Sequence, residues 1–152
     1  MVPAPREDVF AFLSALENHW ALAGRWIQVV SLDRSVGATG GRVRISGPLG
    51  LHRTAVTRVE AVAAPHELTG TAQIGSTVAE VSWTLTARGA AATDVALSTT
   101  IVRSSALDRL LLAVGGAGWM RRLLAGTLAQ LSERFADEPA AALSPALSSA
   151  RA

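Results

Sequence analysis

The segment from Ser105 to about Ala136 constrains the fold most, because it holds the longest helical pattern in the chain. Ser105, followed three residues later by Asp108, has the form of a capping box, which marks a helix N-terminus. Two apolar stripes at helical spacing follow: Leu107, Leu110, Leu111 and Val114 form the first, and Met120, Leu124, Leu128, Leu131 and Phe135 form the second. The pattern predicts one long C-terminal helix, without which the preceding segments could not bury an apolar face.

Gly115, Gly116 and Gly118 lie between the two stripes. At about 100° per residue, the second stripe is rotated by roughly 90° from the first. Three glycines inside a helix cost on the order of 3 kcal/mol relative to alanine. We expect a bend here that fits the helix to a twisted sheet. The alternative is that the glycines leave room for a ligand beside the backbone.

The chain before this helix predicts a helical segment followed by about six strands. Pro5 suits a first helical position, and a helical stripe follows that consists of Val9, Phe12, Leu13, Leu16 and Trp20. Residues 17–24 close this segment, as a second short helix in one interpretation. Strands are expected over 26–34, 42–46, 52–62, 67–74, 77–87 and 94–103, joined by Gly-rich or Pro-containing turns. This order predicts an α+β fold, an antiparallel meander with helices on one face.

Composition limits the possible function classes. The chain has 152 residues, which suits one domain over 1–136 with a disordered Ala/Ser/Pro tail over 137–152. It has no cysteine, and its 14 basic residues are all arginine, scattered and nearly balanced by 12 acidic residues. Nucleic-acid binding is therefore not expected. No secretory leader pattern opens the chain and no apolar run is long enough to span a bilayer, so we expect a cytoplasmic protein.

Alternation along the predicted strands assigns their faces. Gly70 and Ala72 lie on the apolar face of strand 67–74, and their small size predicts space beneath the long helix. The strand that begins at His52 allows two assignments. If Val59 points inward, Arg53 and Thr57 also do, which would place one arginine in an otherwise apolar interior. A slip or a bulge would reverse this.

Three stretches together resemble the START-like (SRPBCC) superfamily, in particular its polyketide cyclase/dehydrase and lipid-transport branch. They are Val2–Leu13 (VPAPREDVFAFL), Val81–Leu85 (VSWTL) and Leu123–Leu131 (LLAGTLAQL). The resemblance spans roughly residues 2–135, and it lies in the order and spacing of the stretches. It implies a helix-grip fold, in which a curved antiparallel sheet wraps around a long C-terminal helix and a hydrophobic ligand cavity lies between them.

The chain departs from that branch in two respects. A strand usually precedes the Pro-Ala-Pro segment, whereas only Met1 and Val2 precede it here. Either the native start lies upstream, or the sheet has a missing or truncated first strand and an edge that needs cover. In addition, relatives that act on polyketides tend to carry polar aromatic and charged groups in the cavity. This chain has no tyrosine, and Arg53 is the one charged candidate for its interior.

Signals of catalysis are weak. The histidines are isolated from one another, so no metal site is expected, and the absence of nucleotide-binding motifs predicts no cofactor. The catalytic candidates are Arg53 and His19, and the alternative for His19 is a surface position after a helix. The candidate ligand-binding residues are Trp20, Trp26, Arg53, Thr57, Ala72, Trp83, Thr99, Val114 and Gly118.

Two functional classes remain open. We favour binding of a small hydrophobic molecule, lipid-like or polyketide-like, between the sheet and the C-terminal helix. The alternative is a cofactor-free cyclase or dehydratase that folds a flexible substrate into a reactive conformation. That alternative requires Arg53 to be buried. A homodimer through an exposed edge strand is a third expectation.

Overall fold

A computed structural model describes residues 1–33, 40–47, 50 and 52–142 of the chain. Two short helices and a single turn of 3-10 helix come first: α1 (Arg6–Ser14), α2 (Leu16–Leu22) and η1 (Gly24–Trp26). Six strands follow: β1 (Ile27–Asp33), β2 (Gly40–Ser46), β3 (His52–Ala63), β4 (Glu67–Ile74), β5 (Thr77–Ala87) and β6 (Thr93–Arg103). The chain continues through α3 (Ala106–Leu111), η3 (Leu112–Gly116) and α4 (Ala117–Ala142).

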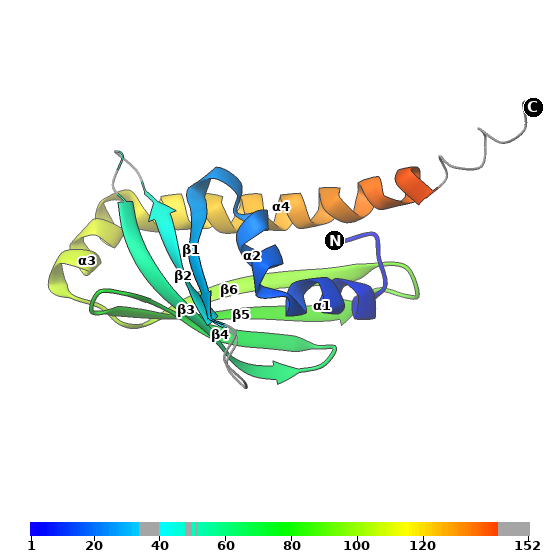
Figure 1. The fold of residues 1–152 in the computed structure, drawn as a ribbon, viewed down its shortest axis with the longest axis horizontal. Coiled ribbons are helices and arrows are strands. Elements are labelled where there is room, and N and C mark those ends of the chain that lie inside the picture. The colour runs from blue at the N-terminus through cyan, green and yellow to red at the C-terminus, as the bar shows by residue number, and fades with distance from the viewer. Residues whose placement is uncertain (34–39, 48–49, 51, 143–152) are drawn as a thin grey trace, which may run out of the picture.

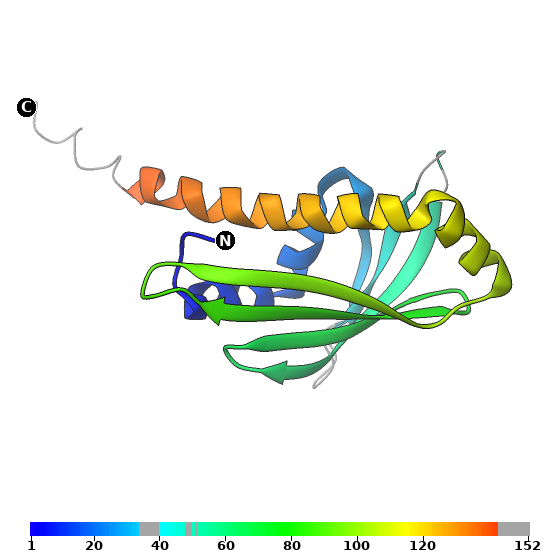
Figure 2. The ribbon, with the colours of Figure 1, turned by 180° about the vertical axis from the view of Figure 1, so that it is seen from behind.

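The six strands form one antiparallel sheet in which every strand pairs with its neighbour in sequence, in the order β1-β2-β3-β4-β5-β6. The sheet is strongly curved, and α4 runs along its length with α1 and α2 on the same side (Figures 1 and 2). The predicted α+β architecture is confirmed as a helix-grip fold. The predicted turns at 36–41 and 47–50 lie partly outside the described residues.

Glycine at position 70 has a structural cause that the sequence did not show. Gly70 pairs with Val59 beside the bulge that shifts the β3–β4 register between Val59 and Ala61. A Cβ atom at Gly70 would lie 2.5 Å from the carbonyl oxygen of Arg58. Because no real Cβ atom tolerates such a contact with backbone, this residue has to be glycine whatever lies beneath α4.

A buried core joins α1 to the sheet and to the second half of α4. Val9 and Leu13 of α1 are fully buried, since the helix turns its apolar stripe towards the sheet. The core cluster contains Val2, Ala4, Val9, Leu13, Leu22, Leu68, Trp83, Leu85, Leu131 and Phe135. The ring of Phe12 meets the ring of Phe135 edge-on, with centroids 5.5 Å apart.

A second, smaller core cluster lies under α2. It contains Leu16, Trp20, Val43 and Ala55. Gly41 is required here, because a Cβ atom at this position would lie 2.5 Å from the indole of Trp20 and 2.7 Å from the carbonyl oxygen of Ser31. The N-terminal helical stripe is therefore divided between the two clusters. Val9 and Leu13 belong to the larger cluster, and Leu16 and Trp20 belong to the smaller one.

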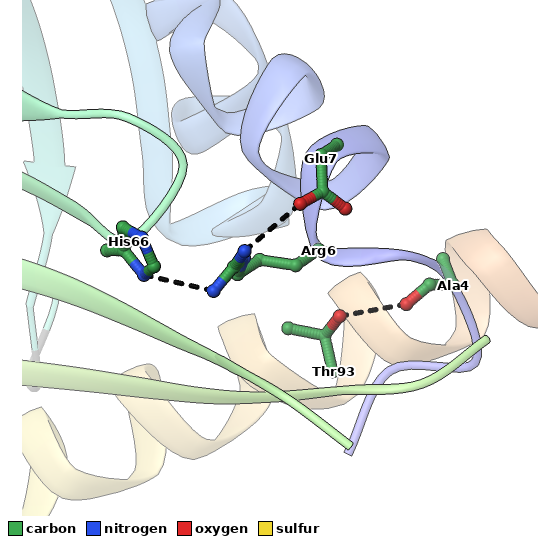
Figure 3. Close-up of polar contacts among 5 residues, drawn as sticks. All are labelled: Ala4, Arg6, Glu7, His66 and Thr93. Carbon is green, nitrogen blue, oxygen red and sulfur yellow. Dashed lines mark hydrogen bonds and ion pairs between the residues drawn. The ribbon is translucent and has the colours of Figure 1, made fainter. Parts of the chain in front are cut away.

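The N-terminal segment is tied across the start of β6 (Figure 3). Val2 and Thr93 form an isolated antiparallel bridge, and the Thr93 hydroxyl donates to the carbonyl oxygen of Ala4 at 2.8 Å. Arg6 contacts the Nδ1 atom of His66 at 3.0 Å and the carboxylate of Glu7 at 3.1 Å. Among the described residues, this single bridge to β6 is the strand-like pairing that precedes the Pro-Ala-Pro segment, where the family usually has a strand.

The C-terminal helix is bent at the glycines, as expected. Ser105 caps α3 by accepting a hydrogen bond from the backbone N–H of Asp108. Val114 and Gly115 leave helical geometry, with φ of 129° at Gly115, and η3 has the wider turn of a π-helix. The predicted disordered tail needs a correction, because α4 continues to Ala142. Its last residues are mostly alanine, the strongest helix former; residues 143–152 lie outside the described part of the chain.

Candidate functional site

The inner face of the sheet carries small residues along two rows that cross the central strands. In the first row, Thr57 pairs with Ala72 and Ala72 pairs with Ala79. The second row pairs Val59, Gly70, Val81 and Thr99 in turn. All of these residues remain partly accessible, although α4 runs along the sheet on this side. Neither row belongs to the fully buried part of the two core clusters.

The first half of α4 is less tightly packed than the second half. Leu131 and Phe135 are buried, whereas Met120, Leu123 and Leu124 are only partly buried and belong to neither core cluster. Because large apolar residues on a helix normally bury their stripe against a sheet, this half of the layer contains accessible apolar surface. The small side chains of the first row contribute to this looser packing.

An aromatic pair links this half of α4 to the end of η1. The ring of Trp26 meets the ring of Trp119 edge-on, with centroids 6.2 Å apart and planes at 85°. Both indoles are partly accessible. Trp26 was a predicted ligand-binding residue, and it lies beside the half of α4 that is loosely packed.

Arg53 lies on the inner face but not in an apolar interior. Its strand alternates as one of the two assignments predicted, with Ala55 fully buried on the same face. Its side chain is 45% exposed, and its Nη1 atom lies 2.5 Å from Oδ1 of Asp108 on α3. The assignment that would bury this arginine in an apolar interior is wrong, because Arg53 stands at the start of β3 beside an open cleft. A catalytic role that requires its burial is therefore not supported.

Asp108 is the buried partner in this ion pair. Its Oδ2 atom accepts a hydrogen bond from the hydroxyl of Thr77, which is also buried. The hydrogen bonds from Thr77 and then from Arg53 lower the pKa of Asp108 below its ordinary value. The carboxylate therefore stays ionised and fastens α3 to the starts of β3 and β5. An open cleft of about 310 Å³ beside it is lined by Arg53, Thr54, Ile74, Gly75, Ser76, Ser105 and Asp108.

His19 is partly buried rather than fully exposed on the surface. Its Nε2 atom donates a hydrogen bond to the carbonyl oxygen of Leu13, and its ring lies 5.4 Å from the ring of Trp83. Burial lowers the pKa of His19, an effect that the hydrogen bond to Leu13 partly opposes. The imidazole is thus neutral near pH 7 and joins α2 to α1. The expectation of a surface histidine is wrong, because the break between the two helices folds residue 19 back over the sheet.

The other predicted ligand-binding residues separate into two groups. Thr57, Ala72 and Thr99 lie in the two rows under α4. Trp20 and Trp83 are buried in the core clusters. Val114 is 78% exposed, and Gly118 is also exposed, with no other atom within 4 Å of the place that a Cβ atom would take. The bend at Gly115 turns this part of the helix away from the sheet.

Sequence reasoning missed Trp119, Ala79 and Thr77. The signal for Trp119 was its place one residue before the second apolar stripe, and for Ala79 its pairing position opposite Ala72. Nothing in the sequence joins Thr77 to Asp108. In the described residues, no group of histidine, aspartate and glutamate side chains is arranged to hold a metal ion. None of the described helices is both long enough and apolar enough to cross a bilayer.

A second open hollow, of about 480 Å³, lies between the short helices and the C-terminal half of α4. It is lined by Phe12, Asn18, Ala21, Leu22, Gln130, Glu133, Arg134 and Asp137. Its lining includes the charged side chains of Glu133, Arg134 and Asp137, and Asn18 already donates to the carbonyl oxygen of Phe12 at 2.7 Å. The loosely packed half under α4 therefore fits an apolar molecule better than this hollow does.

The fold is shared with several solved structures. TTHA0849 from Thermus thermophilus superimposes with a TM-score of 0.70 at 20% identity, over 90% of this chain and 93% of that chain. A protein from Rhodobacter sphaeroides gives a TM-score of 0.61 at 19% identity, over 91% and 89% of the two chains. Ms6760 from Mycobacterium smegmatis gives 0.62 at 16% identity, over 88% and 85%. These likenesses are evidence for the fold alone.

Sequence comparison identifies the family. A search of curated proteins finds no match. The sequence profile of the family described as "Polyketide cyclase / dehydrase and lipid transport" matches residues 1–136, which include every strand, α1 to α3 and most of α4. The chain therefore belongs to the polyketide cyclase/dehydrase and lipid transport family of the START-like superfamily.

Proposed function

We propose that this protein binds a small, mostly apolar molecule, lipid-like or polyketide-like, between the sheet and the first half of α4. The observation that carries the proposal is the row Thr57–Ala72–Ala79, which stays partly accessible although α4 runs along this face of the sheet. Larger side chains at these positions would pack against the helix and close the space. The family described above, which is named for lipid transport and polyketide chemistry, supports the same conclusion.

The chemistry of the surrounding residues supports an apolar ligand. Val59 and Val81 on the sheet and Met120 and Leu124 on the helix supply apolar surface. Two hydroxyl groups, those of Thr57 and Thr99, are the polar groups within the two rows. Small-molecule sites have this composition, mainly apolar walls with a few polar groups that fix orientation. The two rows contain no charged side chain that could pair with a strongly charged ligand.

We do not assign an enzymatic step to this space. The guanidinium of Arg53 is paired with Asp108 at its edge, and the imidazole of His19 donates to Leu13 within the short helices. Neither group stands free in the rows under α4. Binding is the function that the arrangement of side chains supports best.

Native mass spectrometry of the purified protein, followed by solvent extraction, tests the proposal. We expect an adduct of apolar character, or, if the protein purifies empty, saturable binding of palmitate or of the aromatic polyketide emodin. Ala72→Leu should fill the space and abolish binding while the protein stays folded. The matched control is Gln73→Leu, which adds a similar side chain on the opposite, exposed face of the same strand.

The possible outcomes separate clearly. Loss of binding in Ala72→Leu with retention in Gln73→Leu supports the site. Equal binding by both variants would place the ligand elsewhere, and the absence of both an adduct and probe binding would overturn the proposal. Thermal unfolding of each variant shows whether a loss of binding reflects misfolding.

A further inference from the structure

The most exposed apolar surface in the described residues lies on α3 and η3. Leu107 and Leu110 are each 60% exposed, Leu111 is 42% exposed and Val114 is 78% exposed. These four residues are the first of the two apolar stripes in the C-terminal segment, at spacing i, i+3, i+4 and i+7. Contiguous exposed apolar surface of this kind marks an interaction site more often than a chance arrangement.

The orientation of this stripe is fixed by the polar side of α3. Asp108 faces the sheet, where it accepts hydrogen bonds from Thr77 and Arg53. At about 100° per residue, Leu110 lies about 160° around the helix from Asp108 and therefore faces away from the sheet. Leu107 and Leu111 lie to one side of Asp108, and their exposure shows that they also face solvent. The stripe is therefore exposed on a helix that is firmly attached to the sheet, and its exposure does not result from loose packing of α3.

The charges around the stripe are of one sign. Between residues 101 and 125 the charged side chains are Asp108 and four arginines, Arg103, Arg109, Arg121 and Arg122. Asp108 is buried and paired, whereas all four arginines are exposed. Within residues 101–125, the exposed charges are therefore all positive. By contrast, α1 carries both signs, with Glu7 and Asp8 beside Arg6.

This combination favours an anionic lipid surface over a second copy of the chain. A twofold dimer through the stripe would bring the arginines of one copy towards those of the other, and like charges across an interface are unfavourable. An anionic bilayer provides both an apolar layer for leucine and negative head groups for arginine. Long arginine side chains reach the head groups while their stems stay on the apolar surface.

The position of the stripe also suits contact with a flat surface. α3 lies at one end of the molecule, opposite the end at which α4 leads to the C-terminus, and it is angled to α4 by the bend at η3 (Figures 1 and 2). A projecting element can meet a bilayer without steric interference from the sheet. The loosely packed half under α4 lies towards the same end.

We propose that the α3–η3 stripe (Leu107, Leu110, Leu111 and Val114) docks this protein on the surface of a membrane that contains anionic lipids. The leucines enter the boundary between head groups and acyl chains, and the surrounding arginines contact the head groups. Docking is peripheral and reversible, because a single short helix buries little apolar area. This proposal stands apart from ligand binding and does not require it.

Flotation of the full chain with lipid vesicles tests the proposal. Vesicles of phosphatidylcholine alone are compared with vesicles of phosphatidylcholine and phosphatidylglycerol, at low and high salt. We expect binding to the anionic vesicles, weakened by salt. The double variant Leu107→Ser/Leu110→Ser should bind about tenfold or more weakly, because apolar insertion supplies much of the affinity. Arg109→Gln/Arg121→Gln should reduce the preference for anionic vesicles.

The control keeps the amount of exposed apolar surface comparable. Val30→Ser/Val62→Ser changes two residues that are 54% and 55% exposed but lie on β1 and β3. This variant should float as the wild type does. All variants are checked for an unchanged thermal unfolding midpoint, which is expected because the substituted side chains lie on the surface.

Three results would overturn the proposal. The first is no flotation with anionic vesicles, and the second is equal loss in the leucine and valine variants. The third is a dimer in sedimentation velocity that Leu107→Ser/Leu110→Ser dissolves, since it would assign the stripe to a second copy. If Leu107→Ser/Leu110→Ser no longer floats with vesicles but still binds palmitate or emodin, the membrane-docking site is separate from the ligand site.

Discussion

Two halves of the same helix–sheet layer differ in how completely they are packed. In one half, α1, α2 and the end of α4 enclose a core in which Leu13 and Leu131 have no accessible surface. In the other half, α4 runs along the side of the sheet that carries small, partly accessible residues such as Ala72, and α3 turns its leucines outward. The first half holds the fold together, and the second half contains the candidate binding surfaces.

The difference teaches that helical periodicity does not decide what a stripe contacts. The stripe that contains Val9 and Leu13 is as regular as the stripe that contains Leu107 and Leu110. The first pair is nevertheless buried and the second pair is exposed. The deciding factor on α3 is a polar residue, because Asp108 is held by Thr77 and Arg53. A buried, hydrogen-bonded carboxylate on one side of a short helix thus leaves the opposite side of that helix facing solvent.

The largest expected effect is in the packed half. Leu13→Ala removes a fully buried side chain, and it should lower the free energy of unfolding by about 2–5 kcal/mol. The matched change on α3, Leu110→Ala, should stay within about 0.5 kcal/mol of the wild type because the side chain is exposed. Urea denaturation measures both. Similar losses in the two variants would show that the stripes are equally buried, contrary to the comparison.

The bend between the halves can be tested at two glycines. Gly115→Ala introduces a side chain where φ is 129°, and it should destabilise the protein by about 1–3 kcal/mol. Gly118→Ala has open space around it and ordinary helical geometry, so it should stabilise α4 by about 1 kcal/mol. Thermal unfolding distinguishes the two. A ligand that needed contact with the backbone at Gly118 would instead bind more weakly to Gly118→Ala.

The attachment of α3 should respond to acid. The pKa of Asp108 is lowered from 3.8, so its contribution to stability is fully present above that value and is lost as the pH falls through the lower native pKa. Asp108→Asn should therefore destabilise the protein by about 1–2 kcal/mol at neutral pH. It should also show a smaller loss of stability on acidification. Denaturation of the wild type and of Asp108→Asn at a series of acidic pH values measures this difference in the loss of stability. An equal loss in both proteins would contradict a role of the Asp108 carboxylate in attaching α3.

The smallest effect should come from His19 in the packed half. Its native pKa lies below 6.5 because of burial, so the unfolded state takes up a proton first as the pH falls. Stability should decline from about pH 6.5 downward until the native pKa is passed. His19→Gln keeps a donor for Leu13 but does not titrate, and it should flatten this part of the pH profile. An unchanged slope would indicate that His19 is solvated.

Local patterns predicted the elements well. The strand 67–74 and the strand 77–87 have the expected bounds, and Ser105 caps the helix as its spacing with Asp108 indicates. Alternation, turn residues and capping are properties of neighbouring residues, so a single sequence displays them. The bend at Gly115 is of the same kind, because it follows from backbone conformations that glycine tolerates.

Contacts between distant residues could not be predicted in the same way. The partner of Asp108 is Thr77, 31 residues away, and a threonine at a strand start carries no sign of such a partner. Gly70 looked like a ligand-space residue, whereas the carbonyl oxygen of Arg58 at a bulge explains it. Trp20 and Trp83 looked equally suited to a ligand and to a core. Their burial depends on the distant residues that surround them.

The tie at the N-terminus has a consequence for the order in which the chain folds. Each strand closes only a short loop to its neighbour, so the sheet can assemble step by step as it leaves the ribosome. Val2 must instead find Thr93, and the carbonyl oxygen of Met1 accepts a hydrogen bond from Ser132 on the last helix. Contacts of such large sequence separation form slowly, because a long loop has to close. Val2 and its neighbours are therefore expected to be among the last residues to reach their native contacts.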